Sequence, residues 1–118
     1  VAAAAAPVAV TVAANATVTG TTATLLFFSN AAATSFATAI GTGTVATIDA
    51  DMAATEAVAS VYFDSLNGQA VFGYILDSST TAANVLSSAD TFIEVTRVGM
   101  TSTDYTVANI AASFAFAA

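Results

Sequence analysis

The sequence feature that most constrains the fold of this chain is the dipeptide Asn67-Gly68, which lies between two apolar runs. Both residues tolerate positive φ angles, so the pair favours a two-residue type I′ turn between antiparallel strands. Apolar residues recur on either side of it, over residues 58–66 and 69–76. We therefore expect a β-hairpin, in which alternation places the larger side chains of the second arm on one face: Phe72, Tyr74 and Leu76.

Further short runs along the chain have the pattern of strands. Residues 25–28 are a continuous apolar run, as expected of a strand buried on both faces, and residues 91–98 form a longer run that Gly99 ends. With the hairpin, these runs predict about seven to nine short strands and an all-β, single-domain β-sandwich of the immunoglobulin-like or jelly-roll type. The other expected strands cover residues 7–12, 17–24, 105–110 and 113–117. Residues 77–90 are expected to form a polar loop.

Helix is expected to contribute little. Residues 49–59 have the best helix propensity, and Asp49 or Asp51 could accept hydrogen bonds at a helix N-terminus. This stretch runs directly into the strand-like residues 58–63, however. Residues 31–39 are ambiguous, because threonine and serine interrupt their alanines. We expect at most about one or two helical turns.

The side chains that carry most chemistry at neutral pH are missing from the sequence. There is no histidine, cysteine, lysine or tryptophan, and Arg97 is the one basic residue against eight carboxylates. The chain therefore lacks the usual proton shuttle, thiolate nucleophile and Schiff-base amine, which predicts that it is not an enzyme. A net charge of −7 argues against nucleic acid as a partner, and no apolar run is long enough for insertion into a membrane.

The expected partner is a second copy of the same chain. Hydrophobic residues make up 57% of the sequence and charged residues only 8%, so its surface must consist largely of threonine, serine, alanine and asparagine. Such a surface can pack against copies of itself. Lysine is absent and Pro7 is the single proline, so strand edges have little protection against pairing with another chain. The sequence therefore predicts a homopolymer held by strand addition and apolar packing.

The N-terminal residues are the candidate donated strand. We expect the chain to divide into a strand or extension at residues 1–13 and a β-sandwich domain at residues 14–118. Within the first part, Val8, Val10 and Val12 share one face of a strand and could fill a groove on a neighbouring subunit. The alternative, which the sequence leaves open, is that this strand pairs within its own domain.

Arg97 is a candidate for an ion pair at an interface. It lies three residues after Glu94 on an expected strand, where alternation sends the two side chains to opposite faces, so we expect no pairing between them. Arg97 should pair instead with a carboxylate on a neighbouring strand or a neighbouring subunit. The alternative is an exposed, solvated arginine.

Calcium is the one metal ion that the sequence suggests. Asp49-Ala50-Asp51 resembles the start of a calcium loop, in which alternate carboxylates converge on one cation. The pattern then fails, because no glycine stands at the sixth position and Glu56 comes too early for the last ligand. A solvated turn is the favoured alternative, and the expected cofactor is none unless calcium binds here. A second site would require the loops to bring together Asp77, Asp90 and Asp104.

Three segments of the sequence resemble a known group of proteins. Residues 61–64 (Val-Tyr-Phe-Asp), 77–78 and 86–99 are similar to β-rich segments near the C-termini of bacterial repeats-in-toxin and surface-layer-like secreted proteins. The resemblance covers roughly residues 60–110. It implies an extracellular, surface-associated protein. The glycine-aspartate nonapeptides of that group are absent, so its calcium chemistry does not carry over.

Together these features predict a secreted structural subunit of an extracellular filament or surface layer. Two alternatives stay open: a phage capsid decoration or other virion protein, and a secreted module that binds carbohydrate such as a cell-surface glycan. The last would need exposed aromatic side chains beside Asp or Asn, from Tyr62, Tyr74 or Tyr105. Asn15-Ala16-Thr17 also matches the N-glycosylation sequon.

Overall fold

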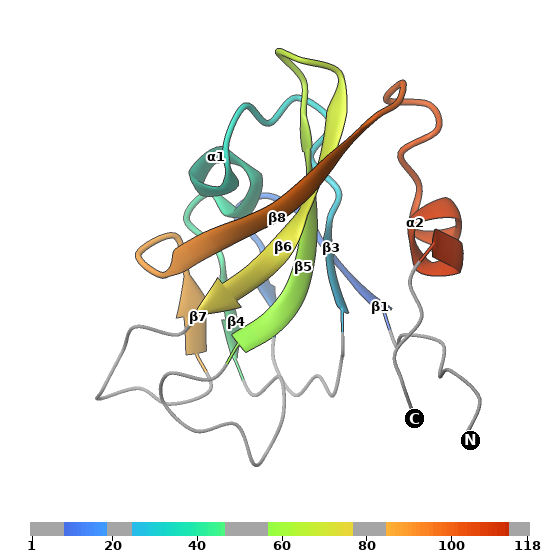
Figure 1. Cartoon of the computed structure of the whole chain (residues 1–118). Helices are drawn as coiled ribbons and strands as arrows, with labels where there is room; N and C mark the ends of the chain where they lie inside the picture. The colour runs from blue at the N-terminus through green and yellow to red at the C-terminus, as the bar shows by residue number, and fades with distance from the viewer. Residues whose placement is uncertain (1–8, 19–24, 47–56, 77–84, 114–118) are drawn as a thin grey trace, which may run out of the picture.

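The computed structural model describes residues 9–18, 25–46, 57–76 and 85–113. These residues form two sheets and two short helices, α1 (Phe36–Ile40) and α2 (Val107–Ser113) (Figure 1). The strand-rich content confirms the all-β expectation. The larger sheet has the order β1 (Ala9–Val12), β3 (Leu25–Phe28), β5 (Ala57–Asp64), β6 (Gln69–Leu76) and β8 (Thr91–Gly99); the smaller has the order β2 (Thr17–Val18), β4 (Thr44–Ala46) and β7 (Val85–Ser87).

Strand pairing in the larger sheet is mixed. β1 pairs parallel to β3 and β3 parallel to β5, whereas β5, β6 and β8 are antiparallel. Immunoglobulin-like and jelly-roll domains are built from antiparallel sheets, so the pairing of the first three strands departs from the expected type. Parallel neighbours need a long crossover that returns the chain to the start of the next strand. Between β3 and β5 that crossover contains α1 and β4.

The central strands of the larger sheet carry buried side chains on both faces. We call the side covered by α1 the α1 face and the side covered by α2 the α2 face (Figure 1). Both clusters draw on β3, whose four residues are all buried, as expected of a continuous apolar run. The α1-face core includes Val12, Leu26, Phe28, Phe36, Ile40, Tyr62, Val71, Ile75 and Leu86, and the α2-face core comprises Leu25, Phe27, Val61, Phe63, Ala70, Tyr105 and Ile110.

The ambiguous residues 31–39 contain a helix start. Ser35 is the N-cap of α1, and its hydroxyl accepts a hydrogen bond from the Thr38 backbone N–H while the Thr38 hydroxyl accepts one from the Ser35 N–H at 3.0 Å. This reciprocal capping box satisfies amide groups that the short helix would otherwise leave without partners. The helical turns expected within 49–56 lie outside the described residues, and Ala57–Asp64 is strand.

The C-terminal strand predicted at 105–110 is wrong, and the one predicted at 113–117 is described only at Ser113, the last residue of α2. Residues 107–113 form α2, in which Ile110 packs into the α2-face core. The Thr106 hydroxyl accepts a hydrogen bond from the Asn109 N–H at 3.2 Å, as a helix N-cap does. Residues 114–118 lie outside the described residues. In the expected polar loop, Val85–Ser87 is the short strand β7, which pairs with β4.

The N-terminal strand belongs to the larger sheet of its own chain. Val10 and Val12 pair with Leu26 and Phe28, and both contribute to the α1-face core, as their alternation predicted. Val8 lies outside the described residues. The expected strand at 17–24 is described only as Thr17–Val18. Neither described helix is long and apolar enough to cross a membrane.

Candidate functional site

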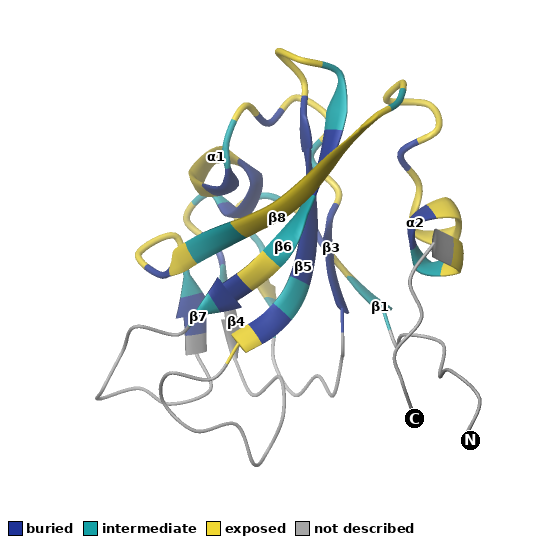
Figure 2. Cartoon of the chain, in the orientation of Figure 1, coloured by how far each residue is buried: buried dark blue, intermediate teal, exposed yellow. Residues whose placement is uncertain are grey.

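The candidate functional site is the edge of the larger sheet that β8 forms. β8 is nine residues long, and among the described residues its ladder partner is β6 alone. Every residue from Glu94 to Gly99 is exposed, and Val95 shows 68% of its surface (Figure 2). The strand has neither lysine nor proline, and its charged residues are Glu94 and Arg97.

A β-bulge interrupts β8 at Val95. Thr96 pairs with Phe72 and Glu94 pairs with Gly73, so two neighbouring residues of β6 face three residues of β8. At Gly73 the backbone of β6 lies close to the Ile93 carbonyl oxygen of β8. Glycine permits this contact, since a Cβ atom at residue 73 would collide with that oxygen. The extra residue reverses the alternation of side chains beyond it.

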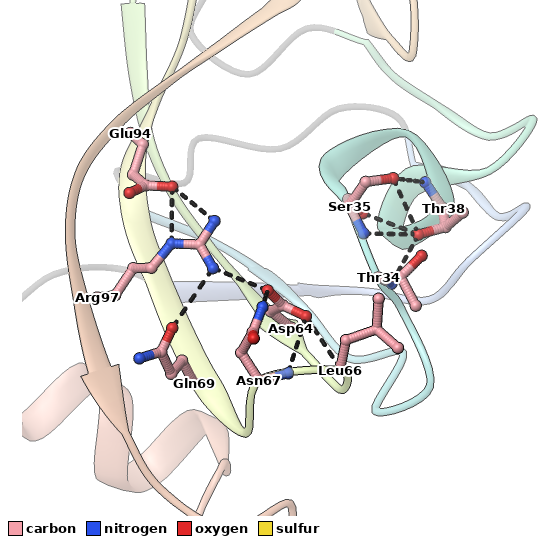
Figure 3. Close-up of polar contacts among 9 residues, drawn as sticks. All are labelled: Thr34, Ser35, Thr38, Asp64, Leu66, Asn67, Gln69, Glu94 and Arg97. Carbon is pink, nitrogen blue, oxygen red and sulfur yellow. Dashed lines mark hydrogen bonds and ion pairs between the residues drawn. The ribbon is translucent and has the colours of Figure 1, made fainter.

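The bulge overturns the prediction that Glu94 and Arg97 do not pair. With Val95 looped out, both side chains lie on the α1 face. The Arg97 guanidinium donates from Nε to Glu94 Oε1 at 2.9 Å, and its Nη2 lies 2.8 Å from the same oxygen (Figure 3). Strand alternation predicted the wrong face because it assumes a ladder without a bulge.

Arg97 also reaches across the sheet. Its Nη1 lies 2.7 Å from Asp64 Oδ2, on β5, and 3.4 Å from Gln69 Oε1, on β6. The sequence predicted a carboxylate on a neighbouring strand or a neighbouring subunit; Asp64 lies within the chain but two strands away, with β6 between. Hydrogen bonds to Glu94 and then to Asp64 raise the pKa of Arg97, so the guanidinium stays charged at all accessible pH values.

Asp64 ties this edge to the hairpin tip. Its buried carboxylate accepts hydrogen bonds from the Leu66 N–H at 3.0 Å, the Asn67 N–H at 3.4 Å and Asn67 Nδ2 at 2.7 Å, besides Arg97. The Asn67 side chain, followed by Arg97, lowers the pKa of Asp64. All four donors favour the ionised carboxylate.

The hydrogen bonds that Asp64 accepts from Leu66 and Asn67 also account for a turn that differs from the predicted one. The hairpin is confirmed as β5 and β6, but Asp64 pairs with Gln69, which leaves residues 65–68 in the loop. Positive φ occurs at Gly68 (62°) and not at Asn67, so the two-residue type I′ turn is wrong. The signal was in the sequence: an aspartate three residues before asparagine can cap the intervening amides.

The aspartates that the sequence suggested as calcium ligands are not gathered into a site among the residues described. In that part of the chain, no group of three or more histidine, cysteine, aspartate or glutamate side chains comes together. Asp49, Asp51 and Asp77 lie outside the described residues, so the calcium hypothesis stays a prediction. Asp90 accepts a hydrogen bond from the Ser87 N–H at 2.7 Å and closes the turn into β8. Asp104 is exposed, on the segment that leads into α2.

The three tyrosines differ in exposure. Tyr62 and Tyr105 are buried, and burial raises the pKa of both. Tyr74 alone is exposed, at 37%. The Tyr105 hydroxyl lies 2.6 Å from the carbonyl oxygen of Phe28 and 3.1 Å from that of Val61, and its ring stacks on Phe27. Tyr105 thus anchors the C-terminal segment to the sheet, a role that no local pattern indicated.

Comparison with known proteins gives no relative. No protein family, no curated protein and no solved structure matches this chain.

Proposed function

We propose that this protein is a structural subunit that assembles with copies of itself outside the cell, as a filament or surface layer, through strand addition at β8. The observation that carries the proposal is the open edge of β8, which is nine residues long, exposed and without lysine or proline. An edge strand presents a row of backbone N–H and C=O groups that another strand can pair with.

The side chains of the edge support the same function. Exposed valines at 95 and 98 accompany Thr91 and Thr96 on β8, and these β-branched residues favour extended backbone and pack well between strands. Glu94 and Arg97 supply one charge of each sign, so the edge itself carries no net charge in a chain of net charge −7. Copies can therefore approach along β8 with less repulsion than elsewhere.

The composition supports assembly over catalysis. A chain without histidine, cysteine or lysine lacks the common groups for proton transfer and covalent catalysis, whereas strand addition needs only backbone and apolar surface. The proposed extracellular location rests on the resemblance of residues 60–110 to secreted surface proteins.

The test is electron microscopy of the purified chain beside two matched variants. Val95→Lys puts a charge on the exposed bulge of β8, and Leu66→Lys makes the same change at the hairpin tip, where Leu66 is 77% exposed. We expect regular polymers from the unchanged protein and from Leu66→Lys, and none from Val95→Lys, because an edge lysine opposes strand addition.

Two results would contradict the proposal. Unchanged protein that stays monomeric at high concentration would rule out self-assembly. Normal polymers from Val95→Lys would rule out the β8 edge. Circular dichroism spectra should be the same for all three proteins, because both substitutions replace exposed residues.

A further inference from the structure

We propose that two copies pair antiparallel through β8, about a twofold axis at the bulge, with Glu94 of each copy opposite Arg97 of the other. This inference rests on the proposed function and specifies its first contact. Three features of β8 support it. They are the face on which each side chain lies, the opposite charges of Glu94 and Arg97, and the register in which both arms can pair at once.

The bulge divides β8 into two arms with opposite alternation. Phe92 pairs with Ile75 and Arg97 with Val71, and both β6 partners belong to the α1-face core. Val98 pairs with Ala70 of the α2-face core. Even-numbered residues before the bulge and odd-numbered residues after it therefore share the α1 face.

This change of alternation restricts how β8 can pair with itself. Residues opposite each other in an antiparallel ladder share a face. The first arm must then meet the second arm of the other copy with an odd sum of residue numbers. An even sum would place α1-face residues of one copy beside α2-face residues of the other, which is a one-residue slip.

Charge selects one register among those that remain. When Glu94 lies opposite Arg97 of the other copy, the axis runs between Val95 and Thr96, and symmetry creates the pair twice. Shifting the sum by two in either direction places Glu94 opposite Val95 or Gly99 instead. Opposite charges directly across a ladder are favourable, so the first register is preferred.

The same register matches the other face. Ile93 lies opposite Val98 of the other copy, and both side chains are on the α2 face, Ile93 partly buried and Val98 45% exposed. The two bulges meet at the axis, so the arms on either side of it pair in the same register. The pair therefore joins two five-stranded sheets into one continuous sheet with β1 at both ends. Growth into a polymer then requires a second contact, because a twofold interface closes on itself.

Cysteine cross-linking tests the register directly, since the natural chain has no cysteine. In the double variant Ile93→Cys/Val98→Cys, the introduced thiols of two copies lie opposite each other, at a separation suited to a disulfide. Within one copy they are about 17 Å apart along the strand and cannot join. We expect mild oxidation to give a covalent dimer from the double variant and none from Ile93→Cys or Val98→Cys alone.

The possible outcomes separate this inference from the proposed function. If the double variant forms polymers but no cross-linked dimer, the twofold register is wrong and self-assembly stands. The same holds if the single variants cross-link as well as the double variant. A cross-linked dimer without polymers would support the register and contradict the filament or layer.

A second measurement avoids the introduced thiols. Glu94→Gln and Asp104→Asn each remove one negative charge, but only Glu94 lies on β8. We expect Glu94→Gln to raise the dissociation constant of the dimer about tenfold at low salt, because two cross-strand charge pairs are lost. Asp104→Asn should leave it unchanged or lower it. Equal effects of the two variants in analytical ultracentrifugation would contradict the pairing.

Discussion

Removing the hydroxyl of Tyr105 should destabilise the protein although it changes no apolar contact. The hydroxyl lies within hydrogen-bonding distance of two buried carbonyl oxygens, of Phe28 and Val61. Its one proton satisfies one of them at a time. Since Tyr105 is 5% exposed, water cannot easily take its place after Tyr105→Phe. The structure thus makes this hydroxyl part of the core.

The size of the effect follows from the buried bond. A buried hydrogen bond contributes about 1 kcal/mol net, so Tyr105→Phe should lower the free energy of unfolding by about 1–2 kcal/mol. Tyr105→Ala also removes the ring stacked on Phe27 at 4.5 Å and should cost about 3–5 kcal/mol or more. That is a large part of the stability of about 5–15 kcal/mol usual for a domain.

Chemical denaturation followed by far-UV circular dichroism measures these differences. The variants are compared in the Val95→Lys background, in which we expect no assembly. Tyr74→Phe is the matched control, because Tyr74 is 37% exposed, and it should change the free energy of unfolding by less than about 0.5 kcal/mol. Equal stability of Tyr105→Phe and Tyr74→Phe would refute the anchoring role of the hydroxyl.

Three other changes test separate parts of the structure. Because the pKa of Asp64 is lowered in the folded protein, its stabilising effect is present above the ordinary carboxyl pKa and is lost as the pH falls through the lowered value. On the acid side, the melting temperature of Asp64→Asn should therefore depend less on pH than that of the natural chain. Parallel plots of melting temperature against pH for the two proteins would contradict this. Gly73→Ala should cost about 1–3 kcal/mol through collision with the Ile93 carbonyl, whereas Gly99→Ala, which meets no atom within 4 Å, should be neutral or stabilising; the reverse order in thermal melts would discount the close approach at the bulge. Polymers held by strand pairing and apolar contacts should survive high salt in light-scattering assays, and should loosen with a chelator only if calcium links the acidic loops; dissolution by salt alone would show that surface charge holds them.

Much of the strand content could be predicted from local pattern. The burial of Leu25–Phe28, the two arms of the hairpin and the end of β8 at Gly99 all follow from residue type and short-range periodicity. These properties depend on neighbours in the sequence, which is why a single chain was enough to find them. The helix α2 was not predicted because Tyr105, Val107 and Ile110 are residue types that favour strands, whereas Thr106 caps a helix in the structure.

The candidate site could be predicted only in part. The sequence singled out Arg97 because it is the one basic residue, and it suggested a carboxylate partner on a neighbouring strand or subunit, with a solvated arginine as the alternative. It could not give the identity of that partner, since Asp64 lies 33 residues away and two strands across the sheet. It also placed Glu94 on the wrong face.

The amino-acid composition and the local pattern were enough to show a chain that is rich in strands, poor in chemically reactive groups and without lysine. Which strand lies at the open edge, and which of its side chains lie on each face, depends on the packing of the whole sheet. The reason is the bulge at Val95, which lies opposite the step from Phe72 to Gly73 in β6, where Gly73 leaves room for the Ile93 carbonyl. Such a choice of register depends on the paired strand and is not encoded in the alternation of either strand alone.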